Sequence, residues 1–177
     1  MHRVRRGGKA AARGFAAVAG NDARVLVLGS LPGQRSIDAA EYYAHPRNVF
    51  WDLVEDFFGI PRILPYAQRT AALVACRVAL WDVLAWSHRR GSLDTSISVA
   101  TSEVNDFAAF YRHHPGIRLV CCNGGKASAL YRRLALPQLA GAPVPFTTLP
   151  STSPAHAAMT YAGKRARWTV MRDAAAS

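Results

Sequence analysis

The sequence is poor in cysteine and has no long apolar run. Its 177 residues include three cysteines, too few for a four-thiolate iron–sulfur cluster or an all-cysteine zinc site. The adjacent pair Cys121 and Cys122 lies in an apolar run, which predicts buried thiols in a reducing cytoplasm. No apolar run approaches the roughly 18 to 20 residues that span a bilayer, so no transmembrane helix is expected. The histidines show no ligand spacing with cysteine or acid, so we expect no metal site.

Acidic residues are scarce in the second half of the chain. The sequence has 22 Lys and Arg against 11 Asp and Glu, a net charge of +11. Residues 1–13 hold five bases and no acid, residues 22–106 eight bases and ten acids, and residues 107–177 nine bases and one acid. This excess indicates a polyanionic partner, a nucleic acid or an anionic membrane.

Apolar runs and helical periodicities alternate along the chain. Buried strands are predicted at 24–28, 78–83, 117–122 and 144–149, and helices at 50–58, 65–75, 105–113, 126–134 and 161–175. The alternation predicts a single α/β domain, residues 23–177, with a parallel sheet covered by helices on both faces. Ligands of such sheets bind outside the carboxyl ends of the strands. Residues 1–22 are interpreted as a basic, flexible arm, with a signal or transit peptide as the alternative.

The first segment of interest, Gly29 to Gly33, directly follows the first predicted strand. It lacks the Gly-Lys-Ser/Thr ending of a phosphate loop and the spacing of a dinucleotide-binding loop. It is either a tight turn or a place where backbone N–H groups of Gly29 and Ser30 approach a ligand.

The second segment, residues 41–51, places two tyrosines, a histidine and an asparagine beside a Phe-Trp pair. Phe50 and Trp51 are interpreted as core residues, and Asn48 as the N-cap of their helix. Tyr43 and Asn48 also suit stacking on, and hydrogen bonding to, a flat heterocycle.

The third segment, residues 149–156, has small hydroxyl residues between prolines. Hydroxyl and N–H groups in such a stiff loop can bind phosphate oxygens, although a simple Pro-rich turn would look similar. The cations Lys164, Arg165 and Arg167 follow closely in sequence.

Taken in order, these segments resemble the uracil-DNA glycosylase superfamily, and more specifically its hypoxanthine-DNA (deoxyinosine) glycosylase branch. The resemblance runs from about residue 24 to residue 172. The motifs that carry it are Gly29-Ser-Leu-Pro-Gly33, Tyr42-Tyr-Ala-His-Pro-Arg-Asn-Val-Phe-Trp51, Trp81-Asp-Val-Leu84 with Gly91-Ser-Leu-Asp94, Asn123-Gly-Gly125, and Leu149-Pro-Ser-Thr-Ser-Pro-Ala155.

The resemblance implies a three-layer α/β/α sandwich around a four-stranded parallel sheet. It also implies a monofunctional glycosylase of base-excision repair, which flips a deaminated base out of DNA and hydrolyses its N-glycosidic bond. Hypoxanthine is the favoured base and uracil the second. No metal or cofactor is implied, and we expect a cytoplasmic, nucleoid-associated monomer that does not bind membranes.

Two departures from the better-known branches affect the expected chemistry. Leu31 and Leu149 stand where those branches carry polar residues that position water or bind the leaving base. The resemblance to the hypoxanthine-type branch therefore assigns the essential polar role to Asn48, which either orients the attacking water or stabilises the sugar cation.

The remaining site residues are assigned from the three segments together with the resemblance, which gives Asp82 and Asp94 structural positions. Residues expected to bind the base are Tyr43, by stacking, Asn123, by reading its edge, and Gly29, Ser30 and His45. Residues expected to contact the DNA backbone or enter the groove are Ser151, Thr152, Ser153, His156, Lys164 and Arg165.

Two other functions are compatible with parts of the sequence. The losses at Leu31 and Leu149 leave open a catalytically silent DNA-binding module with the same fold. A small-molecule hydrolase would need a nucleophile elbow, and the sequence contains no G-x-S-x-G.

Overall fold

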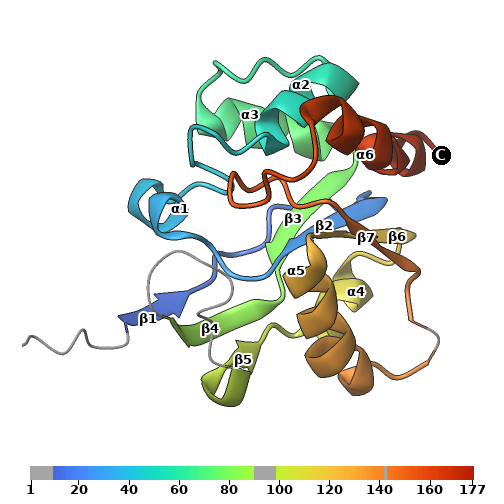
Figure 1. The fold of residues 1–177 in the computed structure, drawn as a ribbon. Coiled ribbons are helices and arrows are strands. Elements are labelled where there is room, and N and C mark those ends of the chain that lie inside the picture. Colours follow the sequence, from blue (N-terminus) through green and yellow to red (C-terminus); the bar gives the residue numbers. More distant parts are fainter. Residues whose placement is uncertain (1–9, 90–98, 142) are drawn as a thin grey trace, which may run out of the picture.

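A computed structural model of the chain describes residues 10–89, 99–141 and 143–177 (Figure 1). The strands are β1 (Ala10–Arg13), β2 (Val25–Gly29), β3 (Val78–Asp82), β4 (Leu84–Arg89), β5 (Glu103–Val104), β6 (Leu119–Asn123) and β7 (Phe146–Leu149). The helices are α1 (Gln34–Ala39), α2 (Phe50–Phe58), α3 (Tyr66–Ala75), α4 (Phe107–His113), α5 (Gly125–Leu130) and α6 (Tyr161–Ala176). Short 3-10 turns span Val99–Thr101 and Leu136–Gln138, and one π-helical turn spans Tyr131–Ala135.

The central sheet has four parallel strands in the order β3-β2-β6-β7. All five residues of β2 are buried, as expected for an apolar strand with neighbours on both sides and helices on both faces. The register pairs Gly29 with Asp82 and Asn123 with Leu149. The four carboxyl ends therefore lie along one edge of the sheet, where the predicted motifs leave it.

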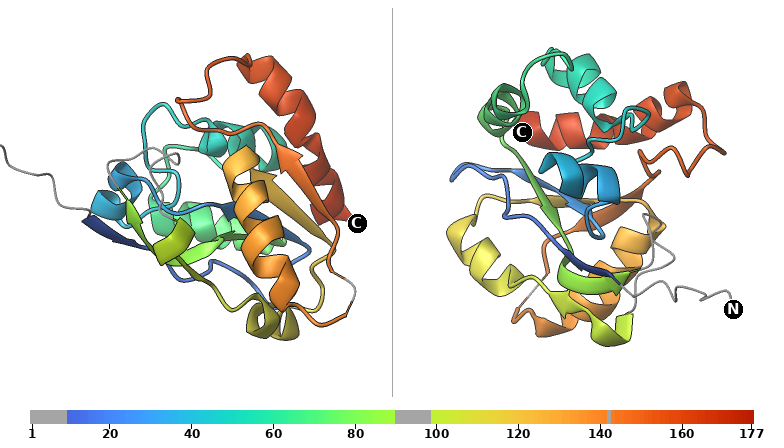
Figure 2. Two further views of the ribbon diagram at one scale, coloured as in Figure 1. Left: turned by 60° about the horizontal axis from the view of Figure 1, so that its bottom comes forward. Right: turned by 90° about the vertical axis from the view of Figure 1, so that its left-hand side faces the viewer.

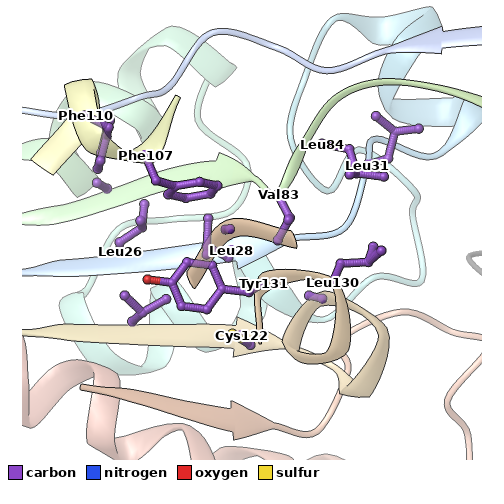
Figure 3. Packing of buried hydrophobic residues seen from close by; sticks show 14 of the residues in the cluster. Leu26, Leu28, Leu31, Val83, Leu84, Phe107, Phe110, Cys122, Leu130 and Tyr131 are labelled. Carbon is purple, nitrogen blue, oxygen red and sulfur yellow. The ribbon is translucent and has the colours of Figure 1, made fainter. Parts of the chain in front are cut away.

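Helices cover both faces of this sheet, which confirms the predicted sandwich. In Figure 2, α2, α3 and α6 lie on one side of the sheet, and α4 and α5 on the other. One core cluster packs around Leu26, Leu28 and Tyr131 on the α4–α5 side (Figure 3). A second cluster around Phe50 and Trp168 fills the side of α2, α3 and α6.

Helix α2 has the bounds that its sequence predicts. Phe50, Trp51, Leu53 and Val54 are buried and form its core face. The helix ends at Gly59, which has a φ of 66°. Glycine adopts this left-handed conformation without a Cβ clash, so it is a common helix stop.

A second, antiparallel sheet in the order β1-β4-β5 was not predicted. It corrects the expected arm for residues 10–22, because Ala10–Arg13 pairs with β4 and Val18 forms a bridge with Leu80. The small and basic residues of β1 show no strand pattern, and β1 pairs with β4, which is distant in sequence. Residues 1–9, and the predicted motif Gly91-Ser-Leu-Asp94, lie outside the described residues.

Candidate active site

Gly29 lies where β2 leaves the sheet, directly beside the carboxylate of Asp82. A Cβ at position 29 would overlap Asp82 Oδ1 and would lie 3.6 Å from the hydroxyl of Tyr43. Backbone bonds from Val83 N to Gly29 O (2.9 Å) and from Leu84 N to Ser30 O (3.1 Å) fix the turn. The missing side chain thus allows a buried carboxylate and a tyrosine to approach the end of β2.

Tyr43 adopts an uncommon backbone conformation beside this turn. Its φ is 58°, in the left-handed region, and its ring centre lies 4.3 Å from that of Phe50. The preceding Tyr42 is fixed on both sides, since its N–H donates to Tyr66 Oη (3.1 Å) and its carbonyl accepts from Trp51 Nε1 (2.9 Å). A strained residue inside a well-fixed loop is typical of a functional position. Burial raises the pKa of Tyr42, so its hydroxyl stays neutral.

Asn48 is 8% exposed and lies just before α2. Its Oδ1 accepts a hydrogen bond from Phe50 N (3.0 Å), and its own N–H donates to His45 O (2.8 Å). The side chain therefore stabilises the helix entry, as the capping interpretation predicts, although the N-cap position itself is Val49. Its Nδ2 has no hydrogen-bond partner among the described residues, so the amide keeps donors for a ligand.

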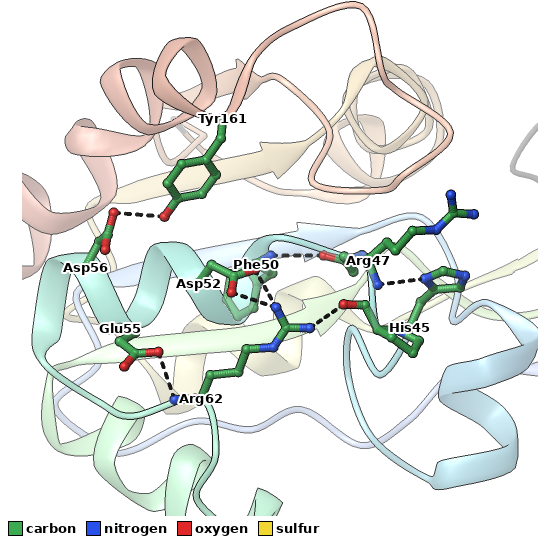
Figure 4. Close-up of polar contacts among 10 residues, drawn as sticks. His45, Arg47, Phe50, Asp52, Glu55, Asp56, Arg62 and Tyr161 are labelled. Carbon is green, nitrogen blue, oxygen red and sulfur yellow. Dashed lines mark hydrogen bonds and ion pairs between the residues drawn. The ribbon is translucent and has the colours of Figure 1, made fainter.

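His45 and Arg62 shape the same loop from its exposed side. His45 is half-buried, and its Nδ1 accepts from Arg47 N (3.1 Å), so in the neutral ring the proton is on Nε2. The guanidinium of Arg62 binds both carboxylate oxygens of Asp52 (2.6 and 2.7 Å) and also donates to Pro46 O (Figure 4). Arg62 thereby connects the loop before Asn48 to the first turn of α2.

Asn123 and Thr152 form a reciprocal pair at the ends of β6 and β7. Asn123 Nδ2 donates to Thr152 Oγ1 (2.8 Å), and Thr152 N donates to Asn123 Oδ1 (2.9 Å). The carbonyl of Thr152 accepts from Val49 N (3.1 Å), next to Asn48. The structure thus brings the second, fourth and fifth motifs together, and Thr152 is buried at their junction rather than presented to a phosphate.

The loop between β7 and α6, residues 150–160, has an exposed tip. Ser151 Oγ accepts from Ser153 N (3.2 Å), and Ser153 Oγ accepts from Ala155 N (3.3 Å). Ala155 to Ala158, including His156, are exposed. The loop runs beside the segment that precedes α2, as Figure 1 shows.

The two cations that follow this loop differ from the expectation of free surface charges. Lys164 is only 5% exposed, and its Nζ donates to His156 O (2.9 Å). Arg165 is exposed but forms an ion pair with Asp56 (2.7 Å), whose carboxylate also accepts from Tyr161 Oη (Figure 4). The sequence predicts that both contact the DNA backbone, because no local pattern shows that the loop folds back over Lys164.

Within the described residues, no group of three or more His, Cys, Asp or Glu side chains could hold a metal ion. No helix among those residues is long and apolar enough to cross a membrane. Of the nearby acids, Asp52 and Asp56 are paired with arginines.

A comparison with protein families shows to which family the chain belongs. The sequence model of the uracil DNA glycosylase superfamily matches residues 17–175. The chain belongs to this superfamily. It is 37% identical over 145 residues to the hypoxanthine DNA glycosylase of Methanosarcina acetivorans, which covers 81% of this chain and 87% of that relative. It is also 37% identical over 116 residues to the hypoxanthine DNA glycosylase of Methanosarcina barkeri, covering 65% of this chain and 72% of the relative.

The fold of a superfamily relative agrees with this result. The solution NMR structure of a candidate uracil DNA glycosylase from Methanosarcina acetivorans superposes with a TM-score of 0.76 at 32% sequence identity. The superposition covers 93% of this chain and 99% of the other.

The two leucines that depart from other branches of the superfamily are core residues here. Leu31 and Leu149 are each 5% exposed and pack into the two clusters on opposite faces of the sheet. Neither side chain can hydrogen-bond to water or to a base. The polar groups brought to this edge are those of Asn48, Asn123 and Asp82, of which Asp82 pairs with Gly29 in the sheet register. The structural position that the resemblance gives Asp82 stays a prediction.

Proposed function

We propose that this superfamily member is a DNA glycosylase that excises hypoxanthine from deoxyinosine, with uracil as the second substrate. The observation that carries the proposal is the convergence of Tyr43, Asn48 and the Asn123–Thr152 pair at one edge of the sheet. Family membership and the names of the two archaeal relatives support the same reaction.

The reaction breaks the bond between C1′ of the sugar and a ring nitrogen of the base. The base leaves with the electron pair, the sugar becomes cation-like, and water adds to C1′. The proton that this water loses balances the negative charge of the released base. We place Asn48 at this step. Its Oδ1 has one lone pair beyond the bond to Phe50 N, which can accept from the water or face the sugar cation. Its Nδ2 can donate to the substrate.

The base itself must leave the stack to reach this edge. Tyr43 would stack on the flipped base from its fixed conformation, while Gly29, Ser30 and His45 border the same turn and loop. Asn123 retains one N–H and one lone pair beyond its bonds to Thr152, which suffices to read one base edge. The exposed tip at His156, with Ser151 and Ser153 beside it, would contact the DNA backbone and groove.

No step of this scheme requires a metal or redox cofactor. A single copy of the chain supplies every group named above, so we propose that it acts as a monomer, on the DNA of the nucleoid.

A panel of oligonucleotides tests the proposal. Duplexes with one hypoxanthine, uracil or xanthine are incubated with the protein, treated with alkali and resolved on a denaturing gel. We expect scission at the hypoxanthine site first, at uracil more slowly, and none in undamaged DNA. Tight binding without scission would favour a catalytically silent DNA-binding module. This is the second candidate, because Leu31 and Leu149 replace polar residues of other branches.

A further inference from the structure

The loop of residues 150–160 is fastened to α6 by two side chains one helical turn apart. Trp168 Nε1 donates to Pro150 O at the start of the loop (2.9 Å), and Lys164 Nζ donates to His156 O at its tip (2.9 Å). Residues four apart lie on one face of a helix. The buried face of α6 therefore binds the loop at both positions.

Lys164 differs from the other cations of α6 in its surroundings. Its side chain is buried, and it forms no ion pair within the described part of the chain. Desolvation lowers its pKa, because burial disfavours the charged form. A buried ammonium is unfavourable unless it is hydrogen-bonded. The burial of Lys164 is therefore explained by its hydrogen bond to the loop, and not by a role as a surface charge.

The part of the loop that Lys164 fixes is its most exposed part. His156 N also donates to Ser153 O (3.0 Å), which closes a turn, so the Lys164 bond orients a compact tip with an outward-facing histidine. The same loop contacts the residue next to Asn48 through Thr152 O and Val49 N. A tip held in this way loses little conformational entropy when it enters DNA.

We infer that Lys164 is a positioning residue, whose bond to the His156 carbonyl holds the loop tip ready to keep a duplex open around the flipped base. The inference rests on the proposed glycosylase function and deepens it. Lys164 does not touch the substrate. It acts on the unpairing of the lesion and not on the cleavage of the glycosidic bond.

Two duplexes separate these steps. In one the hypoxanthine is paired with cytosine, and in the other it faces a stable abasic residue, so that no pairing has to be broken. Single-turnover excision rates are measured on both for the unaltered protein, Lys164→Met and Lys164→Arg. Arg167→Met is the matched control, because it removes the same charge from an exposed position on α6.

Lys164→Met should slow excision of the paired lesion by about tenfold or more, because unpairing costs a few kcal/mol, while the unpaired lesion is excised at nearly the original rate. Lys164→Arg, which keeps the cation and its donors, should restore much of the loss. Arg167→Met should change both rates equally. If Lys164→Met does not fold, Lys164→Gln replaces it, because its shorter amide does not reach His156 O.

Equal losses on both duplexes, or no loss on either, would overturn the positioning role while leaving the glycosylase intact. If the unaltered protein excises hypoxanthine from neither duplex, the proposed function itself is overturned, and this inference with it.

Discussion

At the scale of single residues, Asn48 combines a structural and a proposed chemical role. Its Oδ1 bond to Phe50 N stabilises the start of α2, and its Nδ2 is left for a ligand. The structural role needs only one acceptor for Phe50 N, whereas the chemical role needs the rest of the amide, so the two can be separated by substitution.

We expect Asn48→Ala and Asn48→Ser to be equally inactive but unequally stable. Loss of a cap-type bond costs about 1 kcal/mol, which lowers the Tm of a domain of this size by a few degrees. A serine at position 48 can again accept a bond from Phe50 N, but it lacks the remaining groups of the amide. Excision should fall by about a hundredfold or more in both variants, with Tm preserved only in Asn48→Ser. Melting curves and single-turnover rates measure this, and an active Asn48→Ser would remove Asn48 from the chemistry.

At the scale of elements, the site is assembled by bonds between loops rather than by the strands alone. Asn123 at the end of β6 binds Thr152 after β7, and Thr152 binds Val49 before α2. The position of Asn48 therefore depends on two segments distant in sequence.

Thr152→Val should weaken both stability and excision. It leaves Asn123 Nδ2 buried without its acceptor, at a cost of about 1–3 kcal/mol, and it loosens the junction beside Asn48. Thr148→Val is the control. It also removes a threonine hydroxyl bond, the one that Thr148 Oγ1 on β7 donates to Ser128 Oγ on α5 (2.7 Å), away from the junction. We expect Thr148→Val to excise hypoxanthine at the original rate. Equal excision by both variants would show that the junction does not position Asn48.

Local pattern was sufficient for most elements and insufficient for these junctions. The bounds of α2 follow from a clear apolar face and Gly59, and the central strands from buried apolar runs. The β1-β4-β5 sheet was missed because its strands contain polar and small residues and pair across long sequence distances. The sequence does not predict the burial of Lys164 and Thr152 either, because that burial depends on the course of the 150–160 loop, which no short motif specifies.

At the scale of the whole molecule, the charge of +11 now has a partial location. Arg165 is paired with Asp56, and Lys164 is buried. Fewer positive charges are therefore available to DNA than the number of bases in residues 107–177 suggests. Lys126 lies at the start of α5, near the carboxyl edge of the sheet, whereas Arg118 lies at the opposite end of β6.

Binding to DNA should weaken steeply with salt. For about four phosphate contacts, the affinity should fall about a hundredfold between 50 and 200 mM salt. Lys126→Gln should reduce the slope of log K against log salt by about one, and Arg118→Gln should leave it unchanged. Fluorescence anisotropy with an undamaged duplex gives these slopes. An affinity that does not respond to salt would contradict a backbone contact.

The most direct test of the central claim is the detection of the released base. A duplex with one deoxyinosine is incubated with the unaltered protein and with Asn48→Ser, and free hypoxanthine is measured by mass spectrometry. The unaltered protein should release hypoxanthine in proportion to the abasic sites formed, and Asn48→Ser should release almost none. An unaltered protein that binds the duplex but releases no base would contradict the account.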